Sequence, residues 1–118
     1  MRAFSAMNRK LSRNKKLQEI TETLKAHYSP NKLFLFGSRV DGTSRADSDY
    51  DFVMVLPRFT RDRMRMWEEC RELIRRECGA EVDVFTYSEK EFQESVKEFS
   101  SIPETALNTG REIDLGAS

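Results

Sequence analysis

The stretch of residues 36–55 constrains the fold most, because it joins two short apolar runs through a Gly-Ser turn and two spaced aspartates. It reads FGSRVDGTSRADSDYDFVMV, with ten residues between Gly37-Ser38 and Asp49-x-Asp51. Side chains two apart on an extended strand point to one face, so these two carboxylates can converge on a divalent cation. A glycine turn with exposed N–H groups and a hydroxyl suits phosphate oxygens. The pattern therefore predicts two strands that present a polyphosphate site, although a Gly-Ser pair alone is typical of an ordinary turn.

A third candidate carboxylate is Asp83, which lies within the apolar run of residues 82–85. An unpaired charge between two valines is expensive to bury, so Asp83 is expected to bind a cation. The alternative is a strand residue that faces solvent or pairs with an arginine. Arg39 and Arg45 lie in the polar stretch after Ser38 and are candidates for phosphate contacts, with a solvated surface position as the alternative for both.

Together these motifs resemble the nucleotidyltransferase superfamily of DNA polymerase β. The residues that carry the resemblance are Gly37, Ser38, Asp49, Asp51 and Asp83. Length and motif layout are similar to its minimal nucleotidyltransferase (MNT) branch, the antitoxin partners of helical HEPN toxins. The likeness covers roughly residues 33–114, and residues 108–114 are similar to the short closing segment of that branch.

This resemblance implies an α/β (α+β) fold with a small mixed β-sheet and helices packed on it. It implies a Mg²⁺-dependent transfer of a nucleoside monophosphate, with ATP as the expected substrate, through two Mg²⁺ ions. By position, Gly37 and Ser38 would contact the triphosphate, with Arg39 beside them. Asp49 and Asp51 would bridge both ions, and Asp83 would bind the ion that activates the acceptor hydroxyl. The acceptor implied by the MNT branch is a tyrosine of a HEPN-like helical protein encoded nearby.

Two other functions stay open from the sequence. One is a non-catalytic nucleotide-binding subunit that neutralises or scaffolds a partner, although pure binding would not require three aspartates. The other is a stand-alone transferase acting on a small molecule such as an aminoglycoside, although 118 residues leave no evident drug-binding half. Larger relatives carry an extra domain for the acceptor, so a partner protein is the expected source of it.

Size and charge limit the possible classes further. The 118 residues are expected to form one nucleotidyltransferase domain, residues 1–118, with a basic segment at about residues 1–16. That segment holds six basic and no acidic residues, whereas the 14 basic and 20 acidic residues of 17–118 give a net charge of −6. An acidic body disfavours a broad nucleic-acid surface. The sequence has no long apolar run and no apolar signal core, so a cytoplasmic protein without a membrane span is expected.

Other metal and catalytic patterns are excluded by residue type. A calcium-binding EF-hand loop starting at Asp47 would have Phe52 instead of glycine and Arg58 instead of glutamate at its defining positions. The single histidine makes a Ser-His-Asp arrangement unlikely. Cys70 and Cys78 are eight apart on an expected helix, too distant to bridge, and are predicted to be reduced thiols.

Periodicity and capping signals give the order α-β-β-α-β-α. Helices are expected at about residues 9–28, 60–78 and 88–100, strands at 33–36, 52–56 and 82–85, a helical turn after 103 and a strand around 112–115. Thr60 is the expected cap of the second helix, and Ser88 with Glu91 forms a capping-box pattern. The predicted apolar stripes are Met64, Trp67, Ile74 and Cys78, then Phe92, Val96 and Phe99. Tyr50 is expected to face away from the carboxylates on either side of it.

Overall fold

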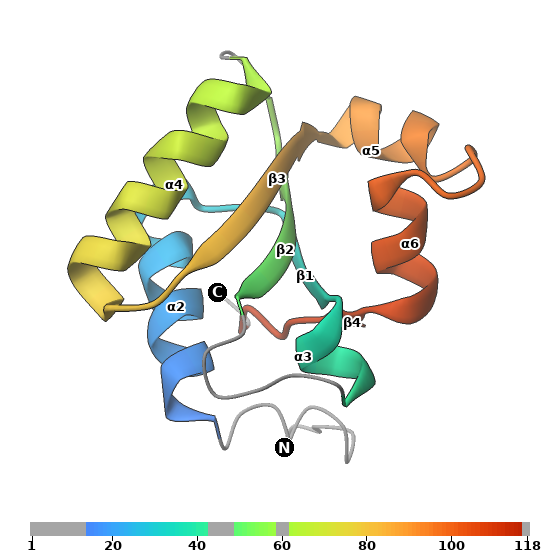
Figure 1. The fold of residues 1–118 in the computed structure, drawn as a ribbon. Helices are drawn as coiled ribbons and strands as arrows, with labels where there is room; N and C mark the ends of the chain where they lie inside the picture. The colour runs from blue at the N-terminus through green and yellow to red at the C-terminus, as the bar shows by residue number, and fades with distance from the viewer. Residues whose placement is uncertain (1–13, 43–48, 59–61, 117–118) are drawn as a thin grey trace.

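The computed structural model describes residues 14–42, 49–58 and 62–116 (Figure 1). Its elements are α2 (Lys15–Tyr28), β1 (Lys32–Phe36), α3 (Ser38–Asp41), β2 (Tyr50–Leu56), α4 (Arg63–Cys78), β3 (Val82–Ser88), α5 (Glu89–Ser95), α6 (Ile102–Thr109) and β4 (Arg111–Glu112). In this part of the chain, no helix is long and apolar enough to cross a membrane.

The strands form one mixed sheet in the order β3-β2-β1-β4. β1 pairs antiparallel with both β2 and β4, whereas β2 and β3 run parallel and are joined through α4. A parallel pair requires such a crossover, and a helix is its usual form. The register places Asp51 of β2 opposite Phe36 on one side and Asp83 on the other. The predicted mixed sheet with packed helices is therefore confirmed.

Helices cover both faces of the sheet, two on each face (Figure 1). On one face, α2 and α4 pack against the even-numbered positions of β2 and β3, including Phe52 and Val84, which are fully buried. Tyr50 lies on this face too, as expected, and is 4% exposed. On the other face, α5 and α6 pack against odd-numbered positions such as Val53 and Val55. Strand alternation thus assigns each side chain of β2 to one of two apolar layers.

The two long helices begin later than the sequence suggested. Asn14 caps α2 by accepting a hydrogen bond from the Leu17 N–H, and residues 9–13 of the predicted helix lie outside the described chain. Asp62 caps α4, so the expected Thr60 cap is wrong; Thr60 itself lies outside the described residues. Aspartate is as good an N-cap as threonine, and the helix starts after the second of the two possible caps.

The buried stripe of α4 is confirmed at Ile74 and Cys78 but differs from the predicted one at its N-terminal end. Met66, Cys70 and Ile74 face the sheet, whereas Met64 is 64% exposed. Met64 and Met66 are separated by about 200° around a helix, so choosing the wrong methionine for the core reverses the helix face at that end. Cys78 is buried as expected, and Cys70 and Cys78 are both free thiols.

The C-terminal helices differ most from the sequence prediction. Ser88 and Glu91 make the predicted capping box, but α5 ends at Ser95 instead of near residue 100. Ser101 then caps a new helix of eight residues that has proline in its first turn. Proline supports a helix start, and this helix agrees with the helical turn predicted after residue 103. The predicted stripe therefore ends early, and Phe99 is 91% exposed.

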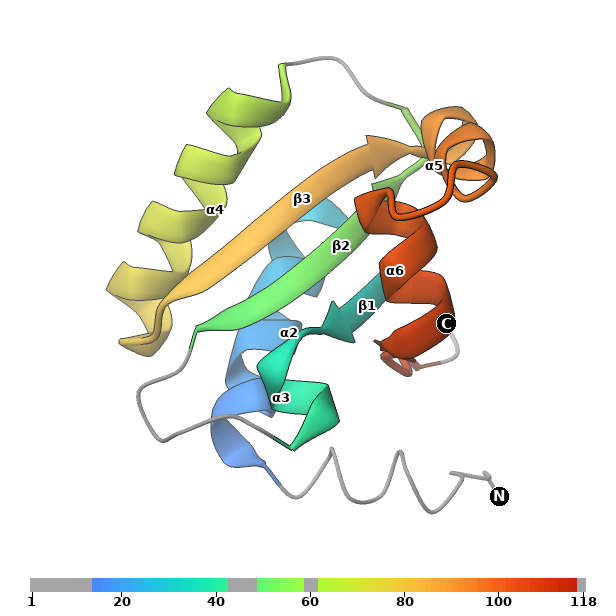
Figure 2. The same cartoon turned by 45° about the vertical axis from the view of Figure 1, so that its right-hand side comes forward.

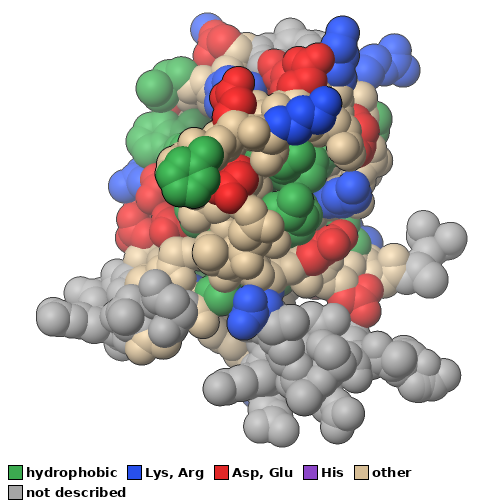
Figure 3. All heavy atoms as spheres, turned by 90° about the vertical axis from the view of Figure 1, so that its right-hand side faces the viewer, with side chains coloured by type: hydrophobic (Ala, Val, Ile, Leu, Met, Phe, Trp, Pro, Cys, Tyr) green, Lys and Arg blue, Asp and Glu red, His purple; other side chains and the backbone are tan. Residues whose placement is uncertain are grey.

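The strands are longer or shorter than expected by a few residues. β2 begins at Tyr50, two residues earlier than predicted, and β3 continues to Ser88. β4 covers only Arg111–Glu112. The surface over α5 and α6 mixes hydrophobic side chains with acidic and basic ones (Figure 3).

Candidate active site

The Gly-Ser turn lies directly against the carboxylate of Asp51. Gly37 follows β1 with φ +80° and ψ −153°, a conformation that is essentially restricted to glycine. A Cβ at this position would lie 2.5 Å from Asp51 Oδ2. Ser38 is the first residue of α3, so the turn and its hydroxyl belong to the same corner. Gly37 and Asp51, which the sequence motif predicts to share one site, therefore lie in close contact.

Asp51 and Asp83 are nearest neighbours across two parallel strands. They are register partners, and each is the second residue of its strand. Both side chains are half-buried. Their odd-numbered positions place them on the sheet face of Val53 and Phe85, at the strand ends farther from α5 (Figure 2). Each strand thus supplies one carboxylate to the same patch of the sheet.

Asp49 and Arg39 flank this pair in different ways. Asp49 directly precedes β2, is half-buried, and is close enough for its charge to act on Asp51. The guanidinium carbon of Arg39 lies 4.1 Å from the centre of the Tyr50 ring, a cation–π contact. Arg39 therefore stacks on a ring that lies on the opposite face of the sheet from the Asp51 and Asp83 carboxylates. Arg45, the other arginine predicted to contact phosphate, lies outside the described residues.

The crowding of these carboxylates changes the acidity of Asp51. Its pKa is raised from 3.8 to about 6, mainly by partial burial and in addition by the charges of Asp83 and Asp49. Desolvation and like charges both disfavour a carboxylate anion. An oxygen-seeking cation at this position would offset both effects.

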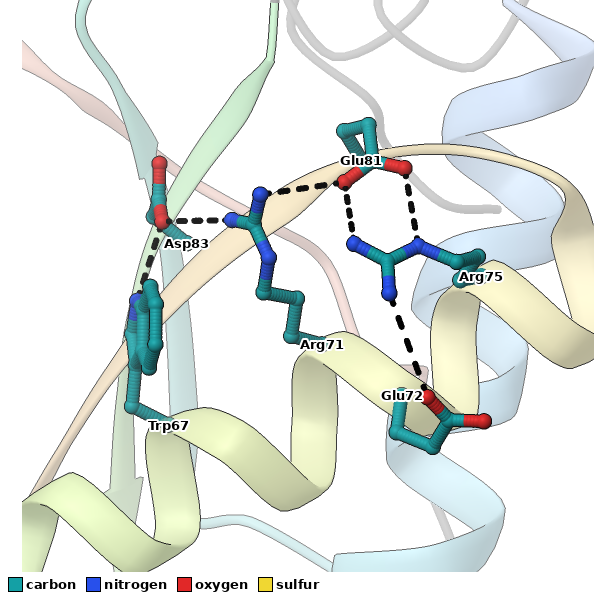
Figure 4. A network of polar contacts seen from close by, with 6 residues as sticks. All are labelled: Trp67, Arg71, Glu72, Arg75, Glu81 and Asp83. Carbon is teal, nitrogen blue, oxygen red and sulfur yellow. Dashed lines mark hydrogen bonds and ion pairs between the residues drawn. The ribbon is translucent and has the colours of Figure 1, made fainter.

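The surroundings of Asp83 come from α4 (Figure 4). Its Oδ1 accepts a hydrogen bond of 2.9 Å from Trp67 Nε1 and one of 3.3 Å from an Arg71 terminal nitrogen. The second oxygen of Asp83 points away from both donors in Figure 4. The arginine pairing that the sequence left as an alternative is thus present, together with an indole contact. Trp67 had been assigned to packing, and only its four-residue spacing from Arg71 indicated a shared helix face.

The donor chemistry of this corner fits Mg²⁺. Among the described residues, no group of three His, Cys, Asp or Glu side chains forms a ready cage for a metal ion. Mg²⁺ is usually held by one or two carboxylates together with substrate phosphates and water, so a protein-only cage is not required. Asp51, crowded by two other aspartates and touching the Gly37 turn, provides that kind of partial site.

Comparison with known proteins gives a family match for most of the chain. The family model described as "Polymerase beta, Nucleotidyltransferase" matches residues 18–114, which include both strands and the turn. A search of curated proteins found no significant match. Among solved structures, the fold is similar to a crystal structure of a toxin–antitoxin with AMP-PNP, with 18% identity and a TM-score of 0.59. That match covers 86% of this chain and 73% of the other chain.

Proposed function

Because the chain belongs to the polymerase β nucleotidyltransferase family, we propose that it transfers AMP from ATP to an acceptor hydroxyl. The observation that carries this proposal is the contact of the Gly37 turn with Asp51, beside Asp83 at the same register. In this arrangement, phosphate oxygens at the turn and a cation on the carboxylates would be neighbours. We take residues 1–118 as one such domain, acting in the cytoplasm.

In the proposed reaction, an acceptor oxygen forms a bond to the α-phosphorus of ATP and the bond to the leaving pyrophosphate breaks. Asp49 and Asp51 would hold two Mg²⁺ ions, and Asp83 would share the one on the acceptor side. When bound, the ions polarise the phosphate and lower the acceptor pKa. Asp83 accepts the acceptor proton, and Gly37 with Ser38 orients the triphosphate. The protein contributes mainly positioning and charge stabilisation.

We further propose that the acceptor is a tyrosine of a helical, HEPN-like toxin encoded beside this chain. Two observations support this partner. The similar solved structure is a toxin–antitoxin that contains AMP-PNP. The described residues form one sheet and the helices packed on it, and we propose that a second protein supplies the acceptor tyrosine.

Intact-mass spectrometry tests this proposal. The purified chain, its helical genomic neighbour, ATP and Mg²⁺ are mixed, and the neighbour is expected to gain the mass of one or more AMP groups. The double variant Asp49→Asn/Asp51→Asn should give no gain. Glu94→Gln, which removes one exposed carboxylate far from these strand ends, is the matched control and should transfer normally.

The competing functions predict other outcomes in the same experiment. A partner that is inhibited equally by the wild-type chain and the double variant, with no change in mass, would indicate a nucleotide-binding neutraliser. Modification of an aminoglycoside by the chain alone would indicate a stand-alone transferase. In either case the protein-adenylylation proposal would be wrong.

A further inference from the structure

The environment of Asp83 assigns a role to two residues of α4 that the proposed reaction does not use. We propose that Trp67 and Arg71 are positioning residues that hold one oxygen of Asp83 and thereby aim the other at the cation. This inference rests on the proposed function, since it concerns the metal-binding carboxylate of that site. Neither residue would touch substrate or metal.

The hydrogen bonds explain how an aspartate on the edge strand keeps one orientation. The terminal torsion of an aspartate side chain lies in a broad, roughly two-fold well, so the backbone alone does not fix the carboxylate plane. Two donors on the same oxygen, at 2.9 Å from Trp67 and 3.3 Å from Arg71, do fix it. The Asp83 side chain is only 24% exposed, which limits competition from water for these bonds.

Arg71 is itself held in place by neighbours on both sides (Figure 4). Its guanidinium lies 5.2 Å from the centre of the Trp67 ring, and its second terminal nitrogen lies 3.3 Å from Glu81 Oε1. Glu81 also accepts two hydrogen bonds, of 3.0 and 2.9 Å, from Arg75. Because Arg71 shares its charge between Glu81 and Asp83, it supports Asp83 without neutralising it completely.

A purely structural role for these residues must be separated from positioning. Arg63, Trp67, Arg71 and Arg75 recur every four residues and follow the outer edge of β3, where Arg63 Nε donates to the Thr86 carbonyl. Such a row also protects an edge strand from pairing with other chains. If edge protection were its only role, loss of one donor would change stability without changing cation binding.

The test measures Mn²⁺ binding by calorimetry in the presence of AMP-PNP, with Mn²⁺ as the probe for Mg²⁺. Trp67→Phe keeps an aromatic ring but removes the donor, and Arg71→Gln removes the charge. Each variant is expected to weaken Mn²⁺ binding by about tenfold or more, as is typical when the residue that orients a metal ligand is removed. Arg76→Gln, on the same helix but paired with Glu77, is the matched control and should bind Mn²⁺ normally.

Fluorescence gives a second measurement of whether the cation binds beside Asp83. Trp67 is the single tryptophan of the chain, so its emission reports on Asp83. Mn²⁺ with AMP-PNP should quench this emission in the wild type and in Arg76→Gln, and Asp83→Asn should abolish the response. Thermal unfolding of each variant verifies that it is folded.

Two outcomes would overturn the proposal, and a third would overturn the proposed function. Wild-type Mn²⁺ affinity in both folded variants would show that Asp83 needs no positioning, and an equal loss in Arg76→Gln would indicate a general effect on α4. A wild-type chain that binds no Mn²⁺ with nucleotide would instead overturn the proposed function on which this inference rests. The measurement therefore distinguishes the failure of each.

Discussion

The β2 side and the β3 side of the candidate site carry the same group in opposite surroundings. On β2, Asp51 is pressed against Gly37 and crowded by other carboxylates, and its pKa is raised to about 6. On β3, its register partner Asp83 receives hydrogen bonds from Trp67 and Arg71. The strands place the two residues symmetrically, whereas α3 and α4 make their surroundings different.

This difference teaches that the two carboxylates are suited to different tasks. Among the described residues, no positive group is recorded as acting on Asp51, and a glycine turn adjoins it. These surroundings favour binding of a cation together with phosphates. The side of Asp83 is oriented and partly compensated by α4 before any ligand binds. Two like groups whose environments differ in this way often divide the roles of a reaction between them.

The largest expected effect separates these roles by mutation. Asp83→Asn should reduce AMP transfer to the partner by about a hundredfold or more, because one metal ligand contributes several kcal/mol to the transition state. ATP binding should remain, since we propose that the triphosphate binds on the β2 side. Asp49→Asn should weaken both transfer and binding. Calorimetry with ATP and Mg²⁺, together with the mass shift of the partner, measures the two effects; equal loss of ATP binding in both variants would refute the division.

A smaller effect is expected from the glycine turn. Gly37→Ala should destabilise the fold by about 3 kcal/mol, near the upper end for a strained backbone position, because φ is +80° and the new Cβ would lie 2.5 Å from Asp51 Oδ2. Displacement of Asp51 should also weaken binding of ATP with Mg²⁺. Urea unfolding and calorimetry measure the two results.

Gly42→Ala is the matched control for this prediction. Gly42 has a similar φ of +89°, but a Cβ there meets nothing within 4 Å. Only the cost of the left-handed backbone remains, about 1–2 kcal/mol. Equal ATP binding by Gly37→Ala and the wild type would show that the close contact with Asp51 is not needed for the site.

Much of the fold was predictable because its strongest signals are local. The strand around residues 52–56, the capping box at Ser88 and the opposite orientation of Tyr50 all follow from patterns within a few residues. The end of α5 and the exposure of Phe99 depend on a competing helix start at Ser101, which periodicity alone does not weigh. The N-terminal end of the core face of α4 was predicted wrongly for a related reason, since two methionines offered alternative stripes.

The carboxylates and the glycine turn of the candidate site were predictable from the sequence, whereas the donors around Asp83 were not. Gly37 and Asp51 belong to one sequence motif, so their spacing predicts that they lie close together in the structure. The donors to Asp83 come from a helix 12 and 16 residues upstream. Their contact depends on how α4 packs along the edge of β3, and that packing is decided by tertiary structure and not by local pattern.

The smallest expected effect concerns stability against pH without metal. The pKa of Asp51 is raised from 3.8 to about 6 by folding, so between these values the folded chain binds more protons than the unfolded chain. The contribution of Asp51 to stability should therefore fall as pH rises from about 4 to about 6, and the cost should persist above that range. Asp51→Asn removes the cost, so it should exceed the wild type in stability at pH 7 by about 1 kcal/mol, allowing for solvent screening of a half-exposed group. Near pH 4 the wild type and Asp51→Asn should have similar stability.

Urea unfolding in EDTA at both pH values gives the comparison, with Glu94→Gln as the control for loss of one negative charge. A pH dependence in Asp51→Asn equal to that of the wild type would show that the crowded carboxylate on the β2 side is not the source of the cost.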